Sequence, residues 1–415
     1  MAITSVAFGG ARAAESLQAG SVQSEPSAKE LDPDQIGQRA ESLNSDLRKR
    51  VVGQDAAIKE IVASYQTYLA GMCSPGRPLC TFLFLGPTGS GKTLLVEAMA
   101  ESLVGNRRAV LKIDCAEFQH SHEIAKLVGS PPGYLGHRDT QPLFSQETLE
   151  ARQTDLVKLN FILFDEIEKA SDALWHLLLG VLDKATLRTG DNRTVDFSGA
   201  MIFMTSNLGA SEMNAVLSNK WGFASPEFVR QYEAGVAEEG LKDKLYRTSV
   251  EAARRKFTPE FMNRIDKTIV FKPLEADDLR KVLKLELNIV QKRLFSAMDG
   301  SGFVFRLTEE AKDYLLAEGT DLKYGARHLK RAIDRHLVSP LSNLIGSGQV
   351  VGGDLIEVHR SPASSRLTFV RAAASLPAYV MAQIVDSSIA SDLTPRVMTT
   401  PSRQSSAATV RSIRS

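Results

Sequence analysis

The segment from Gly86 to Thr93, GPTGSGKT, has three glycines, a lysine and a hydroxyl residue in the spacing of a phosphate-binding loop. An apolar run at 81–85 precedes it and a helical stretch follows, which an incidental Gly-rich loop would lack. Glycines let backbone N–H groups and the helix start approach phosphate oxygens. Lys92 is expected to reach the β- and γ-phosphates, and the Thr93 hydroxyl to bind Mg²⁺. The predicted ATP-binding residues here are Gly86, Pro87, Thr88, Gly89, Ser90, Gly91, Lys92 and Thr93.

Two carboxylates follow a second apolar run, FILF at 161–164. The carboxyl ends of parallel strands are where open α/β sheets bind ligands. Asp165 is therefore expected in the Mg²⁺ shell, with Glu166 as the general base that activates the attacking water. Alternatively, the pair caps a helix that begins near Ser171. The neighbouring phosphate-binding loop favours the catalytic interpretation.

A third apolar run, MIFMT at 201–205, ends just before Ser206 and Asn207. An uncharged amide at a strand end can hold the lytic water or sense the γ-phosphate. A turn-forming asparagine ahead of Leu208 and Gly209 is the alternative.

The elements that must position these groups alternate along the chain. Four short apolar runs, at 81–85, 110–113, 161–164 and 201–205, are separated by helical stretches, which predicts a doubly wound parallel α/β sheet. After Pro273 the strand signal almost stops. A mainly helical domain is expected there, with one helical face made of Leu279, Val282, Leu283, Leu287, Val290 and Leu294.

The predicted organisation has four parts. Residues 1–32 resemble a flexible leader, and residues 33–272 form the large α/β domain, which opens with a helix running from Asp32-Pro33 to Arg50. Residues 273–360 form the small helical lid domain, whose last helix should kink or break at Pro340. Residues 361–415 are expected to be a disordered tail, rich in Ser, Ala and Thr.

Composition narrows the function classes. The 415 residues are 43% hydrophobic and 24% charged, and 50 basic against 49 acidic side chains leave a net charge of +1. Such a balance provides no global field for nucleic acid or an acidic membrane. Three cysteines without paired spacing favour a reducing compartment. Neither a signal peptide nor a membrane-spanning run is expected, so a soluble cytoplasmic protein is predicted.

With these motifs in order, the chain resembles the AAA+ superfamily, and more narrowly the second ATPase module of the Clp unfoldases and disaggregases such as ClpB, ClpC and ClpA. The similarity runs from about Arg50 to Glu357. The phrases that carry it are VVGQDAAI (51–58), GPTGSGKT, GSPPGYLG (129–136), LFDEIEKA (163–170), TVDF (194–197), TSNLGAS (205–211), FTPEFMNRID (257–266) and YGARHLKRAI (324–333).

The resemblance implies further roles. Val52 would lie against the adenine, and Asn207 would be the first sensor. Arg264 would be an arginine finger that reaches the ATP of a neighbouring subunit, which implies a homo-oligomeric ring, a hexamer by analogy. Arg327 would be the second sensor, coupling the lid domain to the γ-phosphate. Tyr134, flanked by glycine, would grip polypeptide in a central pore, although alone it would suggest a packed turn tyrosine.

The sequence also departs from the family. Neither a substrate domain nor a first ATPase module is expected before this module, and a single ring is therefore expected. The stretch after Gly136 is longer than usual and lacks the acidic, glycine-rich start. The nearest match to a peptidase-docking loop tip is Trp221-Gly222-Phe223, which more often would be a packed loop, so a peptidase or adaptor stays undecided. Residues 188–194 could form a second pore loop or a plain turn.

Three functions compete. The favoured one is an ATP-driven protein unfoldase or remodeller that acts on polypeptides. A nucleic-acid remodeller is the first alternative, because one fold can serve both classes, but the near-neutral charge and the Gly-Tyr-Leu-Gly loop argue against it. A nucleotide-controlled scaffold that hydrolyses slowly is the second, and the complete set of catalytic residues opposes it.

Overall fold

The computed structural model describes residues 32–130, 142–213, 215, 236–297, 302–320, 325–360, 366–377, 379–381 and 383–384. Within that part of the chain, no helix has the length and apolar character needed to cross a membrane.

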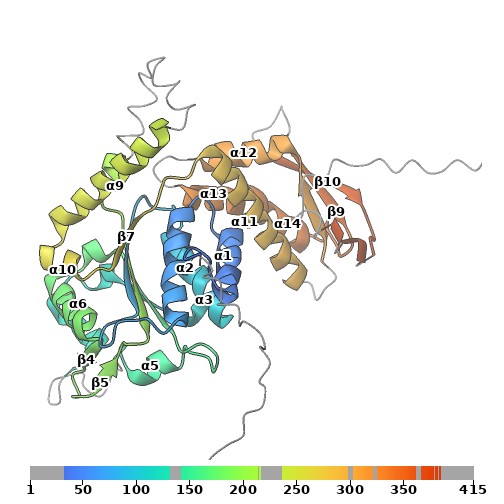
Figure 1. The fold of residues 1–415 in the computed structure, drawn as a ribbon. Coiled ribbons are helices and arrows are strands. Elements are labelled where there is room, and N and C mark those ends of the chain that lie inside the picture. Colours follow the sequence, from blue (N-terminus) through green and yellow to red (C-terminus); the bar gives the residue numbers. More distant parts are fainter. Residues whose placement is uncertain are drawn as a thin grey trace, which may run out of the picture.

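A five-stranded parallel sheet forms the centre of the large domain, in the order β2-β3-β6-β1-β7 (Figure 1). The four apolar runs are confirmed as strands, and their apolar residues are buried because both sheet faces are covered. The edge strand β7 was not predicted, because two of its four residues, Lys267 and Thr268, are polar. The strands are β1 Cys80–Leu85, β2 Val110–Asp114, β3 Asn160–Asp165, β6 Ala200–Ser206 and β7 Lys267–Val270.

Helices cover both faces of this sheet, as the doubly wound prediction requires (Figure 1). On one face Phe82, Phe84 and Phe203 pack against α1, α2 and α3. On the other, Phe164 and Ile202 pack against α5, α6, α9 and α10. The helices are α1 Gln38–Arg50, α2 Asp55–Leu69, α3 Lys92–Val104, α4 Ala125–Val128, α5 Gln146–Glu150, α6 Asp172–Lys184, α9 Val236–Lys256 and α10 Pro259–Asn263.

The first helix begins later than predicted. Asp32 and Pro33 lie in a turn in which the Asp32 carboxylate accepts the Asp34 N–H, and α1 starts at Gln38. A local side-chain hydrogen bond of this kind competes with helix formation, so the Asp-Pro pair marks a turn instead of the helix start.

A small hairpin, β4 Thr186–Arg188 with β5 Thr194–Asp196, contains the segment 188–194 for which a pore loop and a turn were both considered. Its tip touches the chain just before residue 131, since the Gly190 N–H donates to the Val128 carbonyl at 2.7 Å. A Cβ at Gly190 would lie 2.6 Å from the Gly129 carbonyl oxygen, so this contact requires glycine.

The small domain pairs helices with a sheet that the sequence analysis missed. The apolar face beginning at Leu279 packs in its core, as predicted. However, β8, β9 and β10 form a three-stranded sheet in the order β10-β9-β8, so the domain is not purely helical. Its elements are α11 Ala276–Ala297, β8 Val304–Leu307, α12 Glu309–Gly319, α13 Ala326–Ile333, α14 Ser339–Gly346, β9 Leu355–Arg360 and β10 Leu367–Ala373.

Two further expectations for this domain need correction. Residues 367–373, assigned from sequence to a disordered tail from 361, form β10 and pair antiparallel with β9. The regular α-helix is interrupted at Asp334–Val338, a π-helical segment, and Pro340 then falls in the first turn of α14. The Ser339 N–H donates to the Asp334 carbonyl, so the π-helical segment leads directly into α14 and the interruption precedes the proline.

Candidate functional site

The phosphate-binding loop lies between β1 and α3, and its backbone depends on glycine at both ends. Gly86 has a φ of 140°, and a Cβ there would lie 2.6 Å from the Phe271 carbonyl oxygen. Gly91, the residue before α3, has a φ of 100°. These conformations are open to glycine and strained for other residues. They aim the N-terminus of α3, with its free N–H groups, toward the loop.

The Lys92 side chain folds back onto this loop and donates hydrogen bonds to its backbone. Its Nζ donates to the carbonyl oxygens of Gly86 and Pro87 at 2.6 and 2.9 Å. Burial lowers the pKa of Lys92 to about 8, although nearby carboxylates, Glu168 foremost, oppose that shift. A half-buried ammonium held this way is suited to bind phosphate oxygens.

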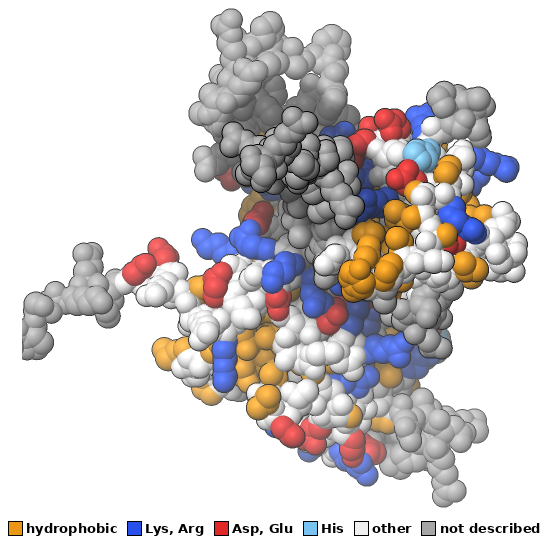
Figure 2. Space-filling view, turned by 90° about the vertical axis from the view of Figure 1, so that its right-hand side faces the viewer, with side chains coloured by type: hydrophobic (Ala, Val, Ile, Leu, Met, Phe, Trp, Pro, Cys, Tyr) orange, Lys and Arg blue, Asp and Glu red, His pale blue; other side chains and the backbone are white. Residues whose placement is uncertain are grey.

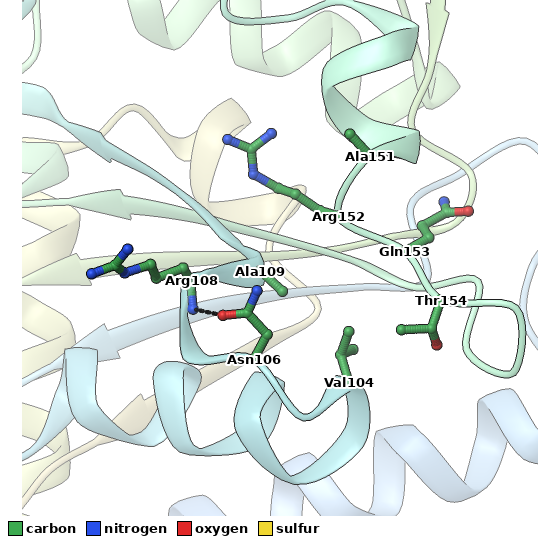
Figure 3. A pocket seen from close by; sticks show the side chains of 8 residues that line it. All are labelled: Val104, Asn106, Arg108, Ala109, Ala151, Arg152, Gln153 and Thr154. Atoms are coloured by element: carbon green, nitrogen blue, oxygen red, sulfur yellow. Dashed lines mark hydrogen bonds between the residues drawn. The ribbon is translucent and has the colours of Figure 1, made fainter. Parts of the chain in front are cut away.

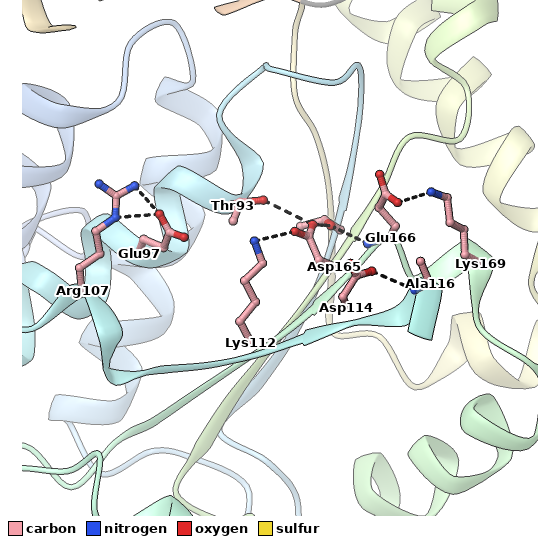
Figure 4. Close-up of polar contacts among 10 residues, drawn as sticks. Thr93, Glu97, Arg107, Lys112, Asp114, Ala116, Asp165, Glu166 and Lys169 are labelled. Carbon is pink, nitrogen blue, oxygen red and sulfur yellow. Dashed lines mark hydrogen bonds and ion pairs between the residues drawn. The ribbon is translucent and has the colours of Figure 1, made fainter. Parts of the chain in front are cut away.

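Three side chains from three different elements contact the Asp165 carboxylate (Figure 4). The hydroxyls of Thr93 and Thr205 both donate to Oδ1, Thr93 at 3.4 Å, and Lys112 Nζ lies 2.9 Å from Oδ2. Burial opposes ionisation of Asp165, but the hydrogen bonds from Thr205 and Lys112 outweigh it and hold its pKa below the ordinary value. The carboxylate is therefore ionised at neutral pH and accepts hydrogen bonds from two hydroxyl groups.

The hydroxyl oxygen of Thr93 and the carboxylate of Asp165 fit the chemistry of Mg²⁺. That ion is typically held by one or two carboxylates together with substrate phosphates and water, not by an all-protein cage. Thr93 and Asp165 would be the protein ligands.

Glu166 occupies a strained turn directly after β3. Its φ and ψ are 57° and 51°, a left-handed conformation that costs a residue other than glycine roughly 1–3 kcal/mol. Its N–H donates to Thr205 Oγ1 at 3.1 Å, and its carboxylate forms an ion pair with Lys169. Such strain often marks functional positions, because the surrounding structure must maintain it. The alternative in which the Asp-Glu pair caps α6 is wrong, since Ser171 occupies that position.

Asn207 lies one residue past the end of β6, and its N–H donates to Glu168 Oε1 at 3.3 Å. Because β3, β6 and β1 are adjacent and parallel, their carboxyl ends share one edge of the sheet. Lys92, Asp165, Glu166 and Asn207 therefore lie at the same edge.

The small domain contacts the loop directly. The Ala326 N–H donates to the Gly89 carbonyl at 3.3 Å. Arg327 follows in the first turn of α13, where it is exposed. A small hollow of about 30 Å³ lies beside this contact, lined by Pro87, Thr88, Gly89, Ser90, Pro273, Leu274, Leu279, Thr320 and Gly325.

Sequence reasoning missed three side chains that organise this region. Gln54 is buried, and it bonds the Ser90 carbonyl at 3.2 Å and both backbone groups of Lys272. It thereby joins the segment of Val52, which is partly buried, to the loop. Lys112 and Glu168 were also not singled out. Gln54 and Glu168 are polar residues inside VVGQDAAI and LFDEIEKA, two of the phrases that carry the family resemblance. That position was the signal that could have identified them.

Other predicted residues lie elsewhere. Arg264 ends α10 and forms ion pairs with Asp183 on α6 and, at 3.5 Å, with Glu260. None of these partners belongs to the loop. Tyr134 and the Trp221-Gly222-Phe223 segment lie outside the described residues.

A larger cavity, of about 390 Å³, lies near the N-terminal end of β2 (Figure 3). The phosphate-binding loop lies at the other edge of the sheet, where the strands end. The cavity has no carboxylate in its lining and is separate from the cluster around Asp165. Its lining residues are Val104, Asn106, Arg108, Ala109, Ala151, Arg152, Gln153 and Thr154.

Comparisons with known proteins agree with this geometry. Residues 77–268 match the family model of the AAA domain (Cdc48 subfamily), and residues 274–358 match the C-terminal D2-small domain of ClpB protein. Chaperone protein ClpB of Meiothermus ruber is 37% identical over 320 residues, which are 77% of this chain and 34% of that protein. The ATP-dependent Clp protease ATP-binding subunit ClpC of Staphylococcus aureus (strain NCTC 8325) is 37% identical over 317 residues, 76% of this chain and 36% of that protein.

A solved structure is similar as well. A chain from the closed-state cryo-EM reconstruction of Hsp104 with ATPγS and FITC casein matches with a TM-score of 0.64 and 27% identity, covering 80% of this chain and 52% of that chain. The chain spans about a third of the length of the curated relatives it matches.

A parallel sheet with a phosphate-binding loop, an Asp-Glu pair and a small domain docked on that loop defines an AAA+ ATPase module. Within that class the chain belongs to the Clp family, and its small domain is of the kind found in the second module of ClpB.

Proposed function

We propose that this chain hydrolyses Mg-ATP in a homo-oligomeric ring, a hexamer by analogy, and uses the energy to unfold or remodel polypeptides drawn through a central pore. The observation that carries the proposal is the convergence of Lys92, Asp165, Glu166 and Asn207 at one sheet edge, with the Clp-type small domain bonded to the same loop. The similar Hsp104 structure was determined with FITC casein, which supports polypeptide as the substrate class.

Each residue then has a chemical task. Loop N–H groups and Lys92 hold the phosphates, while Thr93 and Asp165 supply oxygen ligands to Mg²⁺, which would neutralise phosphate charge when bound. Glu166 accepts a proton from the attacking water, and the Asn207 amide orients that water. Val52 would lie against the adenine. Arg327, one residue after the contact with Gly89, would report nucleotide state to the small domain.

Arg264 would act on the ATP of a neighbouring subunit. Its guanidinium is held by Asp183 and Glu260, on the helices α6 and α10, and not by its own phosphate-binding loop. An arginine supplied in trans stabilises transition-state charge and contributes on the order of 10³-fold or more to turnover.

Mixing two inactive variants tests this arrangement. Arg264→Ala and Glu166→Gln rings should each be nearly inactive, yet a mixture should recover turnover, because a Glu166→Gln subunit supplies Arg264 to a neighbour whose Glu166 is intact. The control Arg255→Ala, exposed on α9, should behave as wild type. Mixed rings that stay inactive while both variants assemble would contradict action in trans.

Binding of ATP should also take up a proton at alkaline pH. Before binding, burial holds the pKa of Lys92 at about 8. Phosphate charge favours the ammonium form and raises that pKa, so uptake should be near zero at about pH 6.5 and should approach one proton at about pH 9. Calorimetry in two buffers of different ionisation enthalpy measures it. Equal, negligible uptake at both pH values would show that Lys92 is already charged before binding.

Stimulation of turnover distinguishes the substrate classes. Unfolded polypeptide should increase ATP hydrolysis by the assembled protein, whereas single-stranded and duplex DNA should not. Basic and acidic side chains are interspersed on the face shown in Figure 2, in keeping with the net charge of +1. Nucleic-acid binders usually concentrate basic groups instead. Stimulation by DNA alone would favour the nucleic-acid alternative, and absence of turnover would favour the scaffold alternative.

A further inference from the structure

The turn that carries the general base also carries a second glutamate, Glu168. Ile167, between the two, is fully buried and its carbonyl accepts a hydrogen bond from Trp175 Nε1 at 3.1 Å, which anchors the turn to α6. The turn, η4 at Ile167–Lys169, is therefore rigidly attached to the core. Side chains on either side of Ile167 are placed by this anchor.

Glu168 points into the site and not into solvent. Its Oε1 accepts the Asn207 N–H at 3.3 Å. Its Oε2 is sealed from solvent and has no hydrogen-bond partner among the described residues. A buried carboxylate oxygen without a partner is destabilising and calls for an explanation. Among the acidic groups, Glu168 also exerts the largest electrostatic effect on Lys92.

The loop that begins at Asn207 is constrained from its other side. The Leu208 N–H donates to Ser206 Oγ at 3.2 Å, and Gly209 packs so closely on α9 that a Cβ would lie 2.8 Å from Ser249 Cα. These contacts hold the residues after Asn207. The N–H of Asn207 itself donates to Glu168 Oε1, from the turn that follows Glu166.

We infer that Glu168 is a positioning residue, which holds the backbone of Asn207 so that the Asn207 amide and the Glu166 carboxylate address the same water. The inference rests on the proposed ATP hydrolysis and adds a residue to it. Glu168 needs no proton transfer for this task, only the reach of its side chain and an oxygen that accepts the N–H. For the position of Asn207, the length and orientation of the Glu168 side chain therefore matter, whereas its charge acts on Lys92.

Two substitutions distinguish the effect of the length of the Glu168 side chain from the effect of its charge. Glu168→Gln keeps the length and a carbonyl acceptor but removes the charge, whereas Glu168→Asp keeps the charge and shortens the side chain by one methylene. We expect the Asp variant to lose about tenfold in kcat with KM for ATP nearly unchanged, as for a lost hydrogen bond that orients a catalytic group. The Gln variant should stay close to wild-type kcat.

A double variant tests the route of the effect. Because Glu168 acts through Asn207, adding Glu168→Asp to Asn207→Ala should lower kcat no further than Asn207→Ala alone, since residues acting as a unit are non-additive. Thermal unfolding checks that each variant is folded. Losses that multiply, a Gln variant as impaired as the Asp variant, or an Asp variant with wild-type kcat would each overturn the inference. Wild-type protein without turnover would instead refute the proposed function.

Discussion

Glu166→Gln should leave ATP binding intact and reduce ATP turnover by about 10²- to 10⁴-fold, the usual contribution of a general base. The amide occupies almost the same volume as the carboxylate but cannot accept the proton of the attacking water. The backbone conformation should survive, because the Glu166 N–H still donates to Thr205 Oγ1.

Steady-state phosphate release gives turnover, and a fluorescent ATP analogue gives affinity. Glu251→Gln is the matched control, since Glu251 is exposed on α9 away from β3. If the Glu166→Gln and Glu251→Gln variants both retained near wild-type turnover, another residue would have to be the general base.

Lys92→Met should weaken Mg-ATP binding by about 30- to 5000-fold, equivalent to the roughly 2–5 kcal/mol lost when one partner of a buried charge interaction is removed. The methionine has a similar length but offers phosphate oxygens neither charge nor N–H groups. It also cannot bond the carbonyls of Gly86 and Pro87, so the loop loses its internal support.

Titration calorimetry with ATP and Mg²⁺ measures the change. Lys59→Met, an exposed substitution on α2, should bind as wild type. Unchanged affinity in Lys92→Met would mean that the phosphates lie elsewhere than in this loop.

Much of the large domain follows from the sequence because its signals are local. Each buried strand is an apolar run, and the polar residue that ends it is adjacent in the chain, as at Asp165 and Asn207. In a parallel sheet such ends share one edge, so proximity of the site residues was predictable without coordinates. The role of the loop glycines was likewise predictable, because close contact between backbone N–H groups and phosphate requires residues without a side chain.

The contacts that depend on side-chain direction were not predictable. Nothing in the run VLKID indicates that Lys112 faces the Asp165 carboxylate, since either face of a doubly covered sheet is possible. The same holds for Arg264, which pairs with Asp183 some 80 residues earlier. Strand β9 was missed although LIEVHR alternates, because the helical pattern that begins at Leu279 was extended to residue 360.

The most direct measurement of the central claim is ATP-driven unfolding of a folded fluorescent reporter that carries an unstructured extension. Wild-type protein should abolish the fluorescence with ATP and not with ADP, Tyr134→Phe should do the same, and Tyr134→Ala should hydrolyse ATP without unfolding the reporter. Equal unfolding by Tyr134→Ala, or ATP turnover stimulated by the extension with the reporter left folded in wild type, would contradict coupling of this ATPase to polypeptide threading.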